Sequence, residues 1–94
     1  MAASYNNIGI VYRKKGDLEN ALLQYQKALD IKIRVFGQEH LSVADTKENI
    51  GLVYETTGKK SEAKTLFTEA AKIRRVKLGP DHPLTKKSER LAAK

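Results

Sequence analysis

The sequence predicts an all-α fold built of tandem antiparallel helix hairpins, with two repeats followed by a short C-terminal helix. Three observations predict this fold. Apolar residues recur at helical spacing through most of the 94 residues. The chain aligns with itself after a shift of 42 residues, and the alignment needs no insertion. A glycine follows each long predicted helix, where a left-handed conformation can end it.

The self-alignment places identical or similar residues on one another along the whole repeat. Asn7-Ile8-Gly9 falls on Asn49-Ile50-Gly51, and Val11-Tyr12 falls on Val53-Tyr54. The other matched pairs are Gly16 and Gly58, Ala21 and Ala63, Tyr25 and Phe67, Ala28 and Ala70, Ile31 and Ile73, Gly37 and Gly79, and His40 and His82. Because the matches concentrate on glycine, alanine and aromatic positions, we interpret them as the packing positions of paired helices.

The first predicted hairpin begins with a helix over residues 3–15, which ends at Gly16. Asp17 offers a side chain suited to cap the second helix, which we expect over residues 18–36, with its end at Gly37. The apolar and aromatic residues of these two helices are Tyr5, Ile8, Val11, Tyr12, Leu18, Ala21, Leu22, Tyr25, Ala28, Leu29, Ile31 and Val35.

The second predicted hairpin repeats this pattern. Its helices cover residues 42–57, ending at Gly58, and residues 60–78, ending at Gly79. A short helix over residues 84–93 follows, and Leu84, Ser88, Leu91 and Ala92 share one of its faces. We therefore expect a single module over 1–94, with repeat 1 over 3–41, repeat 2 over 42–83 and a capping or partial-repeat helix over 84–93.

Residue types exclude several classes of function. The chain has no cysteine, which removes disulfides, thiolate metal sites and cysteine nucleophiles. We find no catalytic triad, paired carboxylates or phosphate-binding loop, so we expect no enzymatic activity and no cofactor. His40 and His82 lie in equivalent loops one repeat apart, too far to share a metal. We expect them to close loops and cap helices.

The chain also lacks the sequence features of membrane and secreted proteins. No run approaches the roughly 20 apolar residues that a membrane-spanning helix needs. The first five residues lack the basic start and apolar stretch of a secretory signal. We therefore expect a cytoplasmic protein that does not enter the membrane.

The net charge of +7 belongs entirely to the last third of the chain. Residues 1–58 contain seven Lys or Arg and seven Asp or Glu, whereas residues 59–94 contain eleven and four. This asymmetry indicates either solvated helix faces or an acidic partner, nucleic acid included. No aromatic residue follows Phe67, which argues against base stacking. The cations on which a nucleic-acid interpretation depends are Lys72, Arg74, Arg75, Lys77, Lys86, Lys87 and Arg90.

The packing positions resemble those of the tetratricopeptide repeat (TPR). The residues that carry this resemblance are Ile8, Gly9, Tyr12, Ala21, Tyr25 and Ala28, then Ile50, Gly51, Tyr54, Ala63, Phe67 and Ala70. The repeat of 42 residues is longer than the usual length of about 34. A Gly-x-acid-His loop also replaces the proline that commonly closes a repeat. Both features are similar to the kinesin light chain subfamily.

The resemblance implies an α-solenoid, a right-handed superhelix whose concave groove binds a peptide or helix of a partner protein. Asn7 and Asn49 share a repeat position at which asparagines of relatives hydrogen-bond a peptide backbone. The groove residues that the resemblance implies are Asn6, Asn7, Ile10, Arg13, Lys14, Asp45, Glu48, Asn49, Leu52, Glu55, Lys87 and Arg90.

Two alternatives to a groove-binding scaffold stay open. Two repeats are fewer than the three that usually make a stable array, so the chain is either a piece of a longer array or a homo-oligomer that covers its open repeat ends. The basic C-terminal third could instead bind an acidic partner or nucleic acid, which is the weaker alternative.

Overall fold

The computed structural model describes residues 2–93, with side chains described for residues 5–93. This part of the chain contains five helices and no strand. The helices are α1 (Ala2–Lys14), α2 (Leu18–Phe36), α3 (Leu41–Thr56), α4 (Lys60–Leu78) and α5 (Pro83–Ala93). Each begins and ends within one residue of its predicted bounds, so the all-α prediction is confirmed.

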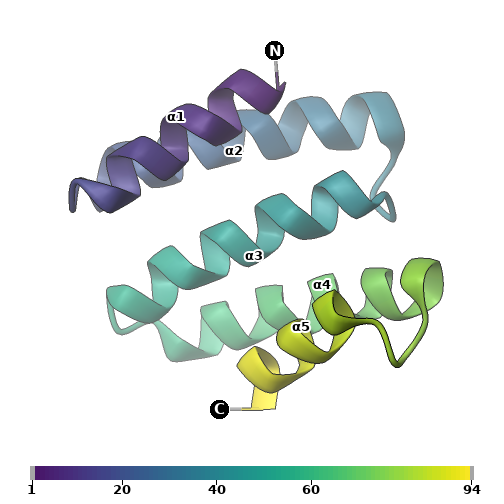
Figure 1. Ribbon diagram of the computed structural model, residues 1–94. Helices are drawn as coiled ribbons and strands as arrows, with labels where there is room; N and C mark the ends of the chain where they lie inside the picture. The colour runs from purple at the N-terminus through teal and green to yellow at the C-terminus, as the bar shows by residue number, and fades with distance from the viewer. Residues whose placement is uncertain (1, 94) are drawn as a thin grey trace.

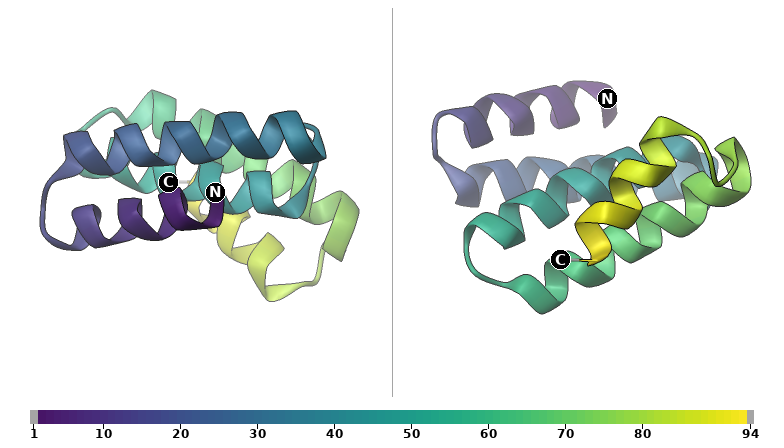
Figure 2. Two further views of the ribbon diagram at one scale, coloured as in Figure 1. Left: turned by 90° about the horizontal axis from the view of Figure 1, so that it is seen from above. Right: turned by 60° about the horizontal axis from the view of Figure 1, so that its bottom comes forward.

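Successive helices are antiparallel and form two layers (Figure 1). Helices α1, α3 and α5 lie on one side of the molecule, and α2 and α4 lie behind them. The views in Figure 2 agree, with α1 and α5 on the side opposite to α2. The first helix of each hairpin therefore contributes to one layer, and the second helix contributes to the other.

Helix ends are set by glycine and by polar caps. The four glycines that follow α1 to α4 have φ between 84° and 94°, the left-handed region in which glycine is favoured. Asp17 Oδ1 accepts a hydrogen bond from Asn20 N at 3.3 Å, as expected of the cap of α2. His40 Nδ1 accepts from Ser42 N at 3.1 Å and so caps α3. His82 Nδ1 accepts from Leu84 N at 3.1 Å in the equivalent loop, so the predicted capping role of both loop histidines is confirmed.

Close contacts inside each hairpin explain the small residues. A Cβ atom added at Gly9 would lie 2.6 Å from Tyr25 Cε1, and one at Gly51 would lie 2.7 Å from Phe67 Cε1. A side chain at either glycine would push the two helices apart, since packed interiors leave no such space. The aromatic rings of α2 and α4 can therefore pack directly on the backbone of α1 and α3.

The core lies between the two layers and continues from one hairpin into the next. One cluster joins Ala21 and Tyr25 of α2 to Ile50 and Val53 of α3. A second cluster joins α3 to α4 through Val43, Ala44, Ala70 and Ile73. Leu29 packs against both clusters, so the two hairpins share one continuous core.

None of the helices within residues 2–93 has both the length and the apolar character needed to cross a membrane.

Candidate partner-binding face

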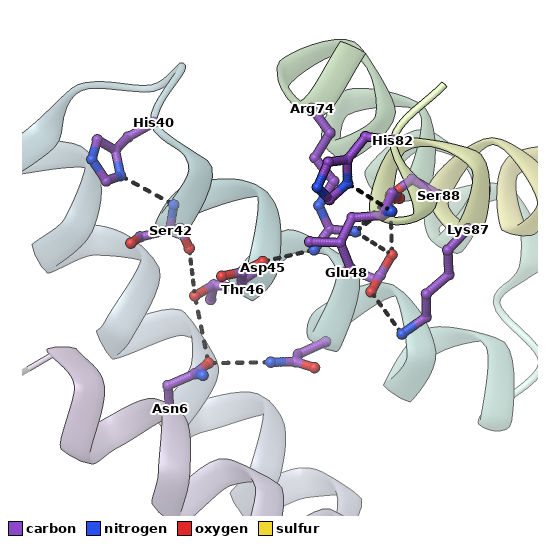
Figure 3. Close-up of polar contacts among 12 residues, drawn as sticks. Asn6, His40, Ser42, Asp45, Thr46, Glu48, Arg74, His82, Lys87 and Ser88 are labelled. Atoms are coloured by element: carbon purple, nitrogen blue, oxygen red, sulfur yellow. Dashed lines mark hydrogen bonds and ion pairs between the residues drawn. The ribbon is translucent and has the colours of Figure 1, made fainter. Parts of the chain in front are cut away.

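A buried arginine ties α3, α4 and α5 together (Figure 3). Arg74 of α4 is only 3% exposed. Its Nη1 donates to Glu48 Oε1 at 2.8 Å and to Ser88 Oγ at 2.7 Å, and its Nη2 donates to Asp45 Oδ1 at 2.7 Å. Charge-assisted hydrogen bonds of this length are among the stronger polar contacts in proteins. The Arg74 cluster therefore links α5 to the second hairpin by polar contacts.

A lysine occupies the equivalent place in the first hairpin. Lys32 Nζ donates to Ser42 O at 3.1 Å and to Thr46 Oγ1 at 3.0 Å. Thr46 Oγ1 also lies 3.5 Å from Asn6 Oδ1, which it meets as a donor. Burial lowers the pKa of Lys32 because the charged form loses hydration, and the nearby Asp45 carboxylate partly opposes this shift. Lys32 therefore connects α2 to α3 without a direct carboxylate partner among residues 5–93.

The two clusters follow the 42-residue repeat position by position. The cation is Lys32 or Arg74, and the hydroxyl that it meets is Thr46 or Ser88. The third member is an acceptor from the preceding first helix, which is Asn6 in one cluster and Glu48 in the other. Each cluster fills the junction between one hairpin and the next helix, so the register of the repeat is fixed by polar as well as apolar contacts.

The face that the sequence predicted to bind a partner is the outer side of α1, α3 and α5, here named the α1/α3/α5 face. Asn7, Lys14, Asp45, Lys87 and Arg90 are exposed. The half-buried members of the predicted set are Asn6, Ile10, Arg13, Asn49, Leu52 and Glu55. These residues come from three helices that share one layer, so the structure brings the predicted positions together on one side (Figure 1).

Glu48 lies beneath this face rather than on it. The residue is 5% exposed, and Oε1 accepts from Arg74 and from Ser88 Oγ, the latter at 3.1 Å. Its other oxygen lies 3.4 Å from Lys87 Nζ. The carboxylate of Glu48 is therefore engaged within the chain, and Lys87 is the member of this group that solvent reaches.

The structure shows that not all of the cations in the last third of the chain, on which a nucleic-acid interpretation depends, lie free on the surface. Arg74, expected among the exposed cations, is buried because the Asp45 and Glu48 carboxylates of α3 compensate its charge and Ser88 of α5 accepts a further hydrogen bond. Arg75 is exposed but pairs with Glu89 at 2.8 Å. The exposed cations Lys72, Lys77, Lys86, Lys87 and Arg90 remain on the surface.

The sequence analysis did not predict roles for three residues of these clusters, which are Lys32, Thr46 and Ser88. The self-alignment could have indicated these positions, because the shift of 42 residues aligns Lys32 with Arg74 and Thr46 with Ser88. In each aligned pair the two residues share their chemistry, a cation in one pair and a hydroxyl in the other, but they are not identical.

Within residues 2–93, no group of three or more His, Cys, Asp or Glu residues is arranged to hold a metal ion.

The fold defines a helical-repeat protein built of tandem helix hairpins. A model of the tetratricopeptide repeat family matches residues 1–75, and the chain belongs to this family. Tetratricopeptide repeats are generally protein–protein interaction modules. No curated protein matches the sequence.

A solved structure shows the same fold. The crystal structure of BtubC (BKLC) from P. vanneervenii matches with a TM-score of 0.86 and 21% identity, over 93% of this chain. The match covers 34% of BtubC, so this chain spans about a third of the length of that protein. These comparisons confirm the predicted tetratricopeptide repeat fold.

Proposed function

We propose that residues 1–94 act as one scaffold that holds a peptide or helix of a partner protein on the α1/α3/α5 face. The observation that carries this proposal is the fixed amide of Asn49. Its Nδ2 donates to Asn6 Oδ1 at 3.3 Å, and the same oxygen accepts from Thr46 Oγ1. The Lys32 cluster beneath the face thus orients a side chain at the face.

The oriented amide of Asn49 suits recognition of a peptide backbone. Its Oδ1 and one N–H have no partner among residues 5–93, so one acceptor and one donor remain available. An amide can pair with a peptide group of any sequence. Because Asn6 already holds the side chain, binding costs less conformational entropy than it would for a mobile asparagine.

Charges around this amide add selectivity for one orientation of the partner. Arg13 and Lys14 carry positive charge at the end of α1. Asp45, exposed on α3, and Lys87, exposed on α5, contribute opposite signs. Mixed charges of this kind select between registers and orientations more than they raise affinity.

The test is a peptide-display selection against the folded chain, repeated with Asn7→Ala/Asn49→Ala. We expect the native chain to enrich peptides that the double variant does not retain. Gln26→Ala is the matched control, because Gln26 is an exposed amide on α2, in the opposite layer. Circular dichroism should show the same helix content in all three proteins.

Two results would contradict the proposal. One is enrichment of the same peptides by the native chain and by Asn7→Ala/Asn49→Ala. The other is the absence of any enriched peptide from a folded native chain. Either result would remove the α1/α3/α5 face as the binding surface.

A second candidate function, self-association, is favoured by one specific observation. Ile8 and Val11 of α1 are 43% and 51% exposed, whereas their repeat equivalents Ile50 and Val53 are each 1% exposed. The apolar face that α3 packs against the preceding hairpin is therefore open on α1. Exposed apolar side chains that lie together are typical of protein contacts.

Light scattering over a concentration series tests this second candidate. Self-association through α1 predicts a mass that rises with concentration and that Ile8→Glu/Val11→Glu returns to the monomer. A native chain that stays monomeric throughout would eliminate it.

A further inference from the structure

Two asparagines, Asn6 of α1 and Asn49 of α3, meet at the α1/α3/α5 face. Asn49 Nδ2 donates to Asn6 Oδ1 at 3.3 Å. An asparagine amide keeps nearly the same shape when its oxygen and nitrogen exchange places, so the surrounding hydrogen bonds decide its orientation. Whatever orients this pair therefore decides which groups the face offers to a partner.

A chain of hydrogen bonds reaches this pair from Lys32, which lies on α2 in the opposite layer. Lys32 Nζ donates to Thr46 Oγ1 at 3.0 Å. Thr46 Oγ1 lies 3.5 Å from Asn6 Oδ1 (Figure 3). Lys32 is only 8% exposed, so a partner on the face does not touch it. We name the four residues Lys32, Thr46, Asn6 and Asn49 the Lys32 relay.

The charge of Lys32 gives the relay its direction. An ammonium group has three donors and no acceptor, so Thr46 Oγ1 can only accept from it. The single proton of Thr46 then has two acceptors within reach, Asn6 Oδ1 and Ser42 O, the latter at 3.3 Å. Ser42 O already accepts from Lys32 Nζ at 3.1 Å and, as a carbonyl of α3, from the main-chain N–H four residues on. Because both lone pairs of Ser42 O are engaged, the Thr46 proton goes to Asn6 Oδ1.

The two amide orientations follow from this direction. Asn6 turns its oxygen towards Thr46, and Asn49 turns its nitrogen towards Asn6, which leaves Asn6 Nδ2 and Asn49 Oδ1 without a partner among residues 5–93. Both atoms reach solvent, since neither belongs to the buried polar atoms that lack a hydrogen bond. The face therefore offers a donor on α1 and an acceptor on α3.

We propose that Lys32 is a positioning residue through which the α1/α3/α5 face selects the direction of a bound extended peptide. In an extended segment, the N–H and C=O of one residue point to the same side. The C=O accepts from Asn6 Nδ2, and the N–H donates to Asn49 Oδ1. Because the N–H of a residue precedes its C=O along the chain, the bound segment runs from α3 towards α1. The direction rests on the proposed function, whereas the relay belongs to the free protein.

The next junction of the repeat does not provide this donor and acceptor. Where the Lys32 relay has Asn6 and Asn49, the second junction has Glu48 and Leu91. A carboxylate has no donor, and a leucine side chain has no polar group. Within residues 5–93, direction is therefore selected where α1 meets α3.

NMR of the side-chain amides in the free protein tests the relay without a partner. Asn49 Nδ2 donates within the relay and Asn6 Nδ2 does not, so the amide protons of Asn49 should exchange with water more slowly. In Lys32→Met, Thr46 can donate to the vacated lone pair of Ser42 O and accept from Asn6 Nδ2. Both amides can then turn over, and the difference between their exchange rates should be lost.

Three further variants separate positioning from a general effect on the fold. Arg34→Met is the matched control, because it removes one exposed cation from the same helix and introduces the same side chain. It should keep the difference in exchange rates. Thr46→Ser retains the hydroxyl and should keep the difference as well, whereas Thr46→Val should lose it. Circular dichroism should show the same helix content in every variant that is compared.

A peptide that the native chain enriches in the display selection tests the direction. It carries a nitroxide label at its N-terminus in one sample and at its C-terminus in another. The N-terminal label should broaden the amide signals of α5 more than those of α1, and the C-terminal label should do the reverse. With Lys32→Met, each label should broaden signals of both helices, because neither direction is favoured.

Several results would overturn the proposal. A difference in exchange rates that survives in Lys32→Met, or that Arg34→Met also abolishes, would remove Lys32 as the positioning residue. A native chain in which both labels broaden α1 and α5 equally, or in the opposite order, would contradict the direction. A selection that enriches no peptide would contradict the proposed function and the direction together, while the exchange rates of the free protein would still decide the relay.

Discussion

Lys32 and Arg74 hold the same position in successive repeats, and each carries its positive charge to a hydroxyl of the first helix of the next repeat. Lys32 Nζ lies 3.0 Å from Thr46 Oγ1, and Arg74 Nη1 lies 2.7 Å from Ser88 Oγ. Arg74 also meets a buried carboxylate, whereas Lys32 meets neutral acceptors. The same position should therefore respond in opposite ways when its charge is removed.

Arg74→Met should lower the free energy of unfolding by about 3 kcal/mol or more, because it leaves the buried Glu48 carboxylate without its main partner. Urea denaturation followed by circular dichroism measures the change. Arg75→Met is the control, since its pair with Glu89 is exposed, and it should change the same quantity by less than about 1 kcal/mol. Similar losses in both variants would show that burial of the Glu48 pair is not what stabilises this junction.

Lys32→Met should leave stability at neutral pH unchanged or raise it by about 1 kcal/mol, because it removes a buried charge that has no direct carboxylate partner. Burial lowers the pKa of Lys32 from its usual 10.5. Between the lowered pKa and 10.5, the unfolded chain holds more protons than the native one, so this lysine makes stability rise with pH.

The pH dependence is measured as the free energy of unfolding of the native chain minus that of Lys32→Met. This difference should increase as the pH is raised towards 10.5, because only the native chain has the titrating group. A difference that stays constant or falls over the same range would mean that the pKa of Lys32 is not lowered in the folded protein.

Replacing either of two buried hydroxyl groups by an apolar group should stabilise the protein. Thr85 Oγ1 and Tyr25 Oη have no hydrogen-bond partner among residues 5–93. Their repeat equivalents are Val43 and Phe67, both fully buried. Thr85→Val and Tyr25→Phe should each raise the free energy of unfolding by about 1 kcal/mol, since an unsatisfied buried hydroxyl costs that much or more.

Thermal unfolding compares these variants with Thr46→Val. Thr46 Oγ1 accepts a hydrogen bond from Lys32 and donates its one proton to Ser42 O or Asn6 Oδ1, so removing it should destabilise the protein. A loss of stability in Thr85→Val comparable to that in Thr46→Val would show that the Thr85 hydroxyl is satisfied in solution.

Gly51→Ala should destabilise the protein by about 1–3 kcal/mol, the usual cost of forcing an extra methyl group into a packed core. The new Cβ would lie 2.7 Å from Phe67 Cε1. Adding Phe67→Leu should recover part of this loss, because the smaller side chain withdraws from the contact. Chemical denaturation of the two single variants and the double variant measures the coupling, and strict additivity would contradict the contact.

The helices were predictable from the sequence, because the features that begin and end each helix are local and recur in both repeats. Glycine ends, the Asp17 cap and apolar spacing all lie within a few residues of the element that they define. The site was predictable only in part. Glu48 and Arg74 read as surface charges in the sequence, and they are buried because each compensates the other across 26 positions of the chain. The charge of a residue alone does not reveal such a pair.

The turns of this chain also bear on how the protein can be lengthened. Gly16 and Gly58 have φ values of 84° and 86°, so the chain leaves α1 and α3 with nearly the same local geometry. The block from Asp17 to Gly58 is consequently a complete unit whose two ends are interchangeable. Inserting a second copy of it after Gly58 would bring Gly51 against a new Tyr25, a contact that follows the existing glycine–aromatic pairing. Duplication of this block would therefore lengthen the array and reuse the turn geometry that the chain already has.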